Sequence, residues 1–313
     1  MKKSFTLFIT LCSFPILFAQ QITGPFTPKS EGGAAWGGVQ YQSFSKVQLA
    51  NDSLRTKQNN LRQVTDFSIP INAIFGASDR IALFLSVPLR FISTSSAVNS
   101  NADSVLANLD TLTAGSIIGF GNVLVGVKYK FFDRNGWFMA ASLTGELKTG
   151  KYDQRTGIRT GIDAWGFRPM LHFGKAWKAK YYVQSDLGGT YRTDNHSGDF
   201  RFQLEGGAFF INSIWIRGGL DINRSFYNGT FERKTDVHYY LYANNQEWVA
   251  LHAQAEYQHT SGFGIYAGIK GFFAGNNIPT TPYFYGGIFF RWKFDLAHKE
   301  NFYIIDKPAS TTN

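Results

Sequence analysis

About twelve stretches of this chain alternate apolar with polar side chains, and each stretch is about ten residues long. A β-strand that crosses a bilayer at a tilt needs about 9–11 residues. Because the hydrocarbon core offers the backbone no hydrogen-bond partner, spanning strands must close into a barrel. The alternation therefore predicts an all-β fold, a transmembrane antiparallel up-and-down β-barrel of about 12 strands.

The connections between these stretches are short and long in turn. Ranges 76–79 and 133–136 have the composition of hairpin turns, whereas 92–118 and 227–246 are long and polar. This asymmetry is typical of bacterial outer-membrane barrels, whose turns lie in the periplasm, and an even strand count places both termini there. The predicted strands are 34–47, 63–75, 80–91, 119–132, 137–148, 165–177, 181–192, 199–212, 214–226, 247–259, 263–273 and 281–294.

A period of two assigns each residue of a strand to one of two faces. In the strand predicted at 199–212, Phe200 and Leu204 share an apolar face, and Arg201 and Glu205 share the polar face. A soluble β-sandwich or lectin would alternate similarly, but a second sheet would cover its apolar face. Aromatic residues make up 17% of the chain and gather near both ends of the predicted strands, as in membrane-interface girdles. The apolar face is therefore predicted to contact outer-membrane lipid.

The chain begins with the features of a secretory signal peptide at 1–19. Lys2 and Lys3 precede an apolar run that ends at Ala19, a small residue suited to cleavage. Cys12, the only cysteine, lies within this segment, so the mature chain is expected to have no disulfide or thiolate-bound metal. Leu11 before it is not the small residue that lipoprotein processing requires, so no lipid anchor is predicted.

The mature chain divides into three predicted parts. An irregular lead-in at 20–33 precedes the barrel at 34–294, and a periplasmic C-terminal tail follows at 295–313. The lead-in is rich in Gly and Pro and is expected to tuck into the mouth of the barrel. Many barrels end on an aromatic residue that the barrel-insertion machinery recognises, and Phe294 is predicted to take that part within the chain.

Charged residues on the polar face are predicted to line the lumen. The formal net charge is +9, but the basic residues are spread among the strands, so nucleic acid is not an expected partner. More basic than acidic residues are assigned to the lumen, which predicts a preference for anions. No cofactor or resident metal is predicted. The candidate lumen-lining residues are Arg80, Arg90, Lys128, Lys130, Arg168, Asp186, Arg201, Glu205, Arg217, Asp221, His252, Glu256, Lys270, Arg291 and Lys293.

Two subsets of these residues carry specific expectations. Four cations come late in strands that run toward the periplasm and are expected to ring that mouth: Lys128, Lys130, Arg291 and Lys293. Asp186, Glu205 and Asp221 fall near the midpoints of three successive strands, where carboxylates repel one another unless cations pair with them. A salt-bridge network is expected, with a divalent cation as the alternative, although no loop has calcium-site spacing. The expected cationic partners are Arg168, Arg201 and Arg217.

Two runs resemble motifs of one protein family. Residues 75–88, FGASDRIALFLSVP, are similar to its FG-turn-DR-apolar-VP hairpin, and residues 119–130, GFGNVLVGVKYK, are similar to its GxGD-x-KY strand. The family is the outer-membrane transporter-like β-barrel family associated with meta-pathway phenol degradation. Asn122 replaces the family's usual Asp, and the run 146–150, ELKTG, lacks the Pro of its LPTG ending. The resemblance implies an outer-membrane channel or transporter for hydrophobic or aromatic compounds, without a set of binding residues.

The predicted function is passive passage of small solutes, hydrophobic or anionic, because twelve strands enclose a narrower lumen than the 16–18 strands of porins. The alternative is a structural or adhesive barrel that acts through loops 92–118 and 227–246. No enzyme is predicted, since a serine nucleophile needs a histidine within reach. His196 and Ser197 fall in a predicted loop, and His259 and Ser261 in a predicted tight turn, so neither pair shares a strand face.

Overall fold

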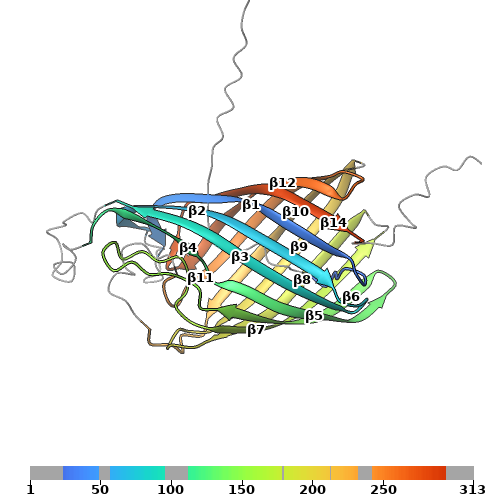
Figure 1. The fold of residues 1–313 in the computed structure, drawn as a ribbon, viewed down its shortest axis with the longest axis horizontal. Coiled ribbons are helices and arrows are strands. Elements are labelled where there is room, and N and C mark those ends of the chain that lie inside the picture. Colours follow the sequence, from blue (N-terminus) through green and yellow to red (C-terminus); the bar gives the residue numbers. More distant parts are fainter. Residues whose placement is uncertain are drawn as a thin grey trace, which may run out of the picture.

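The computed structural model describes residues 24–48, 57–95, 112–177, 180–211, 213–231 and 242–293. These residues form one closed antiparallel barrel (Figure 1). In these ranges, helices long and apolar enough to cross a membrane are absent.

The wall of the barrel has twelve positions. β1 pairs with both β2 and β14, which closes the sheet on itself. β4 and β5 both pair with β3, and β13 and β14 both pair with β1, so each of these two pairs shares one position. The strands are β1 (Gly33–Gln48), β2 (Lys57–Gly76), β3 (Ile81–Thr94), β4 (Gly115–Phe120), β5 (Val123–Arg134), β6 (Trp137–Leu147), β7 (Gly166–Trp177), β8 (Tyr181–Arg192), β9 (Asp199–Ile211), β10 (Ile214–Ser225), β11 (Glu247–Gln258), β12 (Phe263–Asn276), β13 (Ile278–Pro279) and β14 (Tyr283–Trp292).

The predicted fold class is confirmed, and the strand ranges differ mainly at the loop end. β2 begins at Lys57 instead of residue 63, and β12 continues to Asn276 instead of ending at 273. The strand predicted at 119–132 is interrupted at Gly121 and Asn122. There the Asn122 side chain accepts a hydrogen bond from the Ile162 amide at 2.6 Å and donates one to its carbonyl at 2.9 Å. At this interruption, the segment after β6 therefore supplies the backbone hydrogen-bond partners that a neighbouring strand would otherwise supply.

The turns gather at one end of the barrel and the longer connections at the other (Figure 1). The turn between β5 and β6 consists of Asn135 and Gly136, whose φ angles are 52° and 75°. Two left-handed residues in a two-residue turn match the right-handed twist of the flanking strands. This is the tight hairpin that the composition of 133–136 predicts. The ends that carry such turns and the longer loops are called here the turn end and the loop end.

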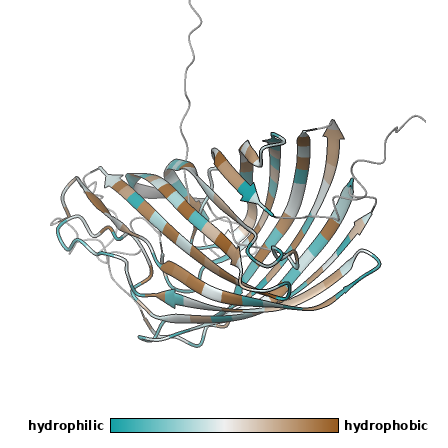
Figure 2. Ribbon diagram, turned by 45° about the vertical axis from the view of Figure 1, so that its right-hand side comes forward, coloured by the Kyte–Doolittle hydropathy of each residue, from teal (hydrophilic) through white to brown (hydrophobic). Residues whose placement is uncertain are grey.

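Exposure alternates along the strands in the sense opposite to that of a soluble protein. On β9, Phe200, Leu204 and Phe210 are exposed, whereas Arg201 is buried. Figure 2 shows this alternation as hydrophobic and hydrophilic bands along the strands. Soluble proteins bury apolar side chains and seldom bury charged ones. An exposed apolar wall around buried charges is the arrangement of a barrel that sits in hydrocarbon.

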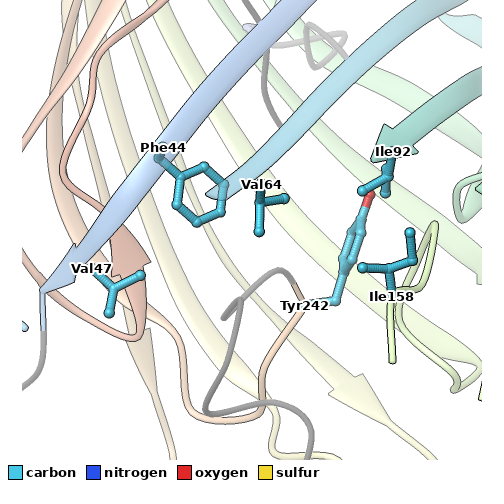
Figure 3. Packing of buried hydrophobic residues seen from close by; sticks show 6 residues of the cluster. All are labelled: Phe44, Val47, Val64, Ile92, Ile158 and Tyr242. Carbon is cyan, nitrogen blue, oxygen red and sulfur yellow. The ribbon is translucent and has the colours of Figure 1, made fainter. Parts of the chain in front are cut away.

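The largest apolar cluster lies inside the barrel at its loop end (Figure 3). Phe44, Val64 and Ile92 contribute to it from β1, β2 and β3, and Ile158 and Tyr242 reach it from connecting segments. All five side chains are at most 5% exposed. The connecting segments therefore fold into the mouth instead of standing away from it.

Candidate functional site: the barrel lumen

At mid-lumen, the Asp186 carboxylate forms hydrogen bonds both with a side chain of the barrel wall and with the backbone of the lead-in. Asp186 on β8 lies 2.6 Å from Nδ1 of His172, and Nε2 of that ring lies 2.8 Å from Oγ of Ser142. The Gly24 amide donates to both oxygens of Asp186 at 3.0 Å, and the Lys128 ammonium donates to the Gly24 carbonyl at 2.6 Å. The register explains this contact, because His172 and Asp186 are paired residues of β7 and β8.

The lead-in runs from this group to the turn end inside the barrel. The Phe26 ring lies 5.0 Å from the ring of Phe138 and 5.9 Å from that of Tyr182, measured between centroids. Pro25 packs so closely on Gly174 that a Cβ there would lie 2.6 Å from the proline ring. The first described residues of the chain therefore fill part of the turn half of the lumen.

A second group lies nearer the turn end, on β9 to β14. Glu205 lies 3.1 Å from Nε2 of His252 and 3.9 Å from Nη1 of Arg217. Arg217 also forms an ion pair with Glu256, and Arg291 lies 2.7 Å from the other oxygen of Glu256. Cations and carboxylates therefore alternate around this part of the lumen.

A third group lies toward the loop end. Asp221 on β10 pairs with Arg201 on β9 at 3.1 Å and with Lys270 on β12. The neighbouring strands add Arg192, which lies 2.6 Å from Asp199. All these carboxylates are nearly inaccessible to solvent, so each depends on its cation for stability.

Next to this group is a small pocket of about 40 Å³. Arg168, Arg192 and Arg201, from three successive strands, contribute to its lining. Ile162 and Ala243 also contribute to its lining and pack against the apolar cluster at the loop end. Asp199, the partner of Arg192, also lines the pocket, so paired charges and apolar side chains adjoin at the loop end.

At the mouth itself, arginines hold the connecting segments in place. Arg90 forms an ion pair with Asp66 and donates to the Tyr242 hydroxyl. Arg62, which is 1% exposed, donates to backbone carbonyls of Ser95, Thr113 and Thr156, three residues that lie far apart in the chain. Each guanidinium thus ties inward-folded segments to the wall.

The segment after β6 is also held by partly exposed charges in the connections at the loop end. The Lys148 ammonium lies 3.2 Å from Asp163 and 3.1 Å from Asp194, and the bond from Lys148 lowers the pKa of the Asp194 carboxyl. The Thr156 hydroxyl donates to Asp153 and lowers the pKa of that carboxyl. Both carboxylates are therefore charged at neutral pH.

The sequence from residue 38 to residue 285 matches the family described as "Putative MetA-pathway of phenol degradation". The chain belongs to this family. The match spans the wall from β1 to β14, so the resemblance inferred from residues 75–88 and 119–130 is confirmed.

One solved structure shares the barrel of this family member, and others are less similar to it. The COG4313 outer membrane channel from Pseudomonas putida F1 superposes with a TM-score of 0.62 at 12% identity, covering 88% of this chain and 100% of that one. A mutant of the monoaromatic hydrocarbon channel TodX gives 0.48 at 11% identity, covering 87% and 94%. The NanC porin gives 0.49 at 7% identity, covering 83% and 100%. Among curated proteins, none matches the sequence.

Ten of the fifteen residues singled out from the sequence lie in the three groups. Arg90 and Arg168 lie nearer the loop end of the lumen, and the other three, Lys130, Arg80 and Lys293, lie at the turn end. Arg80 is exposed in the turn between β2 and β3, because the Ser78 hydroxyl accepts the amides of both Arg80 and Ile81 and delays the start of β3. Lys293 is exposed beyond β14, where it pairs with Glu31 of the lead-in at 2.8 Å. The assignment of these two to the lumen is wrong.

The expected ring of cations at the turn-end mouth is also wrong. Lys128 is fully buried at mid-lumen, and Lys130 pairs with Asp133 at 2.7 Å near the turn. Arg291 is held by Glu256. Because lumen cations and carboxylates pair closely, the lining is nearer to neutral than the sequence predicts.

The expected salt-bridge network is present, but only some of the carboxylates have the cationic partners that the sequence predicts. Asp221 pairs with Arg201, and Glu205 lies within ion-pair distance of Arg217, as predicted. Asp186 instead bonds to His172. Arg168, the third expected partner, faces Glu146 at 3.7 Å. In the described ranges, no group of acidic, histidine or cysteine side chains could hold a metal ion.

Several residues were not assigned to the lumen from the sequence: Asp66, Ser142, Glu146, Tyr182, Arg192, Asp199 and Tyr242, the last of which was expected only as a contact residue of loop 227–246. For most of them the signal was the alternation itself, since they lie on the polar face of a strand. Tyr242 carries no such signal, because it lies outside the strands.

Proposed function

We propose that this protein is a bacterial outer-membrane channel that passes small solutes passively through a narrow polar lumen, with both termini in the periplasm. The observation that carries the proposal is the apolar exposed wall around a buried, charged interior. Outer-membrane lipid, a small solute and the barrel-insertion machinery are its proposed partners. The lead-in and the inward-folded segments narrow the passage, so bulky solutes are excluded.

The solutes that fit best are small aromatic or apolar molecules, including anionic ones. The apolar cluster at the outer mouth suits an aromatic ring, and the pocket beside it offers guanidinium donors, each already paired with a carboxylate, to a polar group on that ring. The description of the family, phenol degradation, supports aromatic solutes.

We infer that the barrel is not an enzyme, although Ser142, His172 and Asp186 form a chain of hydrogen bonds of the kind found in serine hydrolases. Ser142 is only 8% exposed, and the Asp186 carboxylate also accepts a hydrogen bond from the Gly24 amide. The trio therefore serves to anchor the lead-in.

The alternative of an adhesive barrel needs loops that project outward. In the described part of 227–246, Tyr242 instead packs into the apolar cluster, and the Asn244 side chain accepts a bond from the Ser197 amide of a neighbouring connection. This geometry favours the channel.

Conductance of the purified protein in planar bilayers tests the proposal. Discrete open-channel steps are expected, and their absence would reject a pore. Arg291→Gln is expected to shift the reversal potential toward cation preference, because Glu256 loses one of its two cations. Lys293→Gln, which removes a charge outside the lumen, serves as the control and is expected to leave the potential unchanged.

A further inference from the structure

Tyr242 places a phenol ring inside the apolar cluster at the loop end (Figure 3). Its neighbours Phe44, Val64, Ile92 and Ile158 are each at most 2% exposed. They come from three adjacent strands and from the segment after β6, and Figure 3 shows Ile92 and Ile158 beside the ring, with Val64 and Phe44 farther along the cluster. Tyr242 itself belongs to none of these elements and enters the cluster from the connection before β11.

The Arg90 guanidinium, a polar group beside this cluster, is placed to bind the phenolic oxygen. Arg90 donates a hydrogen bond to the Tyr242 hydroxyl, and its guanidinium carbon lies 4.9 Å from the centroid of the ring. Asp66, which is fully buried, pairs with the same guanidinium and fixes its position. Apolar walls, a donor aimed at the oxygen and a cation beside the ring together make a site that suits a phenol.

The backbone of Tyr242 is not in a conformation that the residue prefers. Its φ angle is +59°, in the left-handed region that bulky residues seldom adopt. Such strain persists only where the surroundings enforce it. Here the burial of the ring and the bond to Arg90 hold the residue in place. The packing of the ring and its hydrogen bond therefore offset the conformational strain in the Tyr242 backbone.

We propose that this cluster is a binding site for monocyclic phenols, occupied in this structure by the side chain of Tyr242, and that an incoming phenol displaces that side chain. The Tyr242 side chain beyond Cα has the covalent structure of 4-methylphenol, so the free molecule fits the space that it leaves. The onward passage of the phenol rests on the proposed channel function, but its binding does not.

Titration calorimetry of the detergent-solubilised full chain tests the site with two probes, 4-methylphenol and toluene. Tyr242→Ala is expected to bind 4-methylphenol at least tenfold more tightly than the natural protein does, because the competing ring is gone. It is expected to bind 4-methylphenol more tightly than toluene, which gives Arg90 no oxygen. Equal affinity of the variant and the natural protein, or no preference over toluene, would overturn the proposal.

A second measurement uses the natural protein, so it does not depend on how the variant folds. Nitration by tetranitromethane, supplied in excess because free 4-methylphenol also consumes it, is followed at Tyr242 and at exposed Tyr227 by tandem mass spectrometry. Saturating 4-methylphenol is expected to raise the ratio of Tyr242 to Tyr227 nitration severalfold, whereas toluene leaves it unchanged. A ratio unaffected by 4-methylphenol would contradict displacement. Because neither measurement requires conductance, failure of the site and failure of the pore are distinguished.

Discussion

At the scale of single residues, the interior is organised by pairing of charges. Asp221 is inaccessible to solvent and faces both Arg201 and Lys270, whereas Asp194 lies in an exposed connection and faces Lys148. A buried ion pair stabilises little in itself, but removing one partner leaves the other charge buried and uncompensated. An exposed pair is screened by water and contributes little.

We therefore expect Asp221→Asn to lower the free energy of unfolding by about 3–5 kcal/mol. The substitution leaves two buried cations without their carboxylate. Urea titration of the barrel folded into lipid vesicles measures the loss. Asp194→Asn is the matched control and should change the unfolding midpoint little. Equal effects of the two substitutions would show that the lumen is as well hydrated as the surface.

At the scale of strands, each residue belongs to one of two surroundings. Leu204 on β9 is exposed on the apolar face, and the adjacent Gln203 lies on the lumen face, where its paired residues on β8 and β10 are Asp186 and Asp221. A cation at the first position would enter hydrocarbon, whereas a cation at the second would meet carboxylates.

Leu204→Lys is expected to destabilise the folded barrel by about 2–4 kcal/mol, the cost of a lysine near the bilayer midplane. Gln203→Lys, one residue away, should cost little. The same urea titration in vesicles compares the two. If both lysines cost the same, the assignment of faces along β9 would be incorrect.

The strands could be predicted from the sequence because period-two alternation is a local property. Partners inside the lumen could not, because they depend on how far each strand is staggered against the next. Arg168 was expected to meet one of the three carboxylates Asp186, Glu205 and Asp221, but it faces Glu146, a residue of β6 paired with the start of β7. Arg80 was misplaced because the bonds from Ser78 shift the start of β3 by one residue. The site at Tyr242 depends on a contact between distant segments.

At the scale of the molecule, the barrel is narrowed from both ends. The lead-in enters at the turn end and reaches Asp186, and the segments after β6 and before β11 close over the apolar cluster at the loop end. Between them the lumen is lined by paired charges. All of this presupposes that the outer surface of the barrel lies in a bilayer.

Spin labelling tests that presupposition most directly, since Cys12, in the predicted signal peptide, is the only cysteine in the sequence. Single cysteines are introduced at successive positions from Phe200 to Glu205, spin-labelled, and reconstituted in lipid vesicles. Collision with oxygen, which concentrates in hydrocarbon, is expected to peak at 200, 202 and 204. Collision with a water-soluble nickel complex should be low at these three positions. Equal accessibility at odd and even positions, or nickel access at all six, would contradict a lipid-facing wall around a polar lumen.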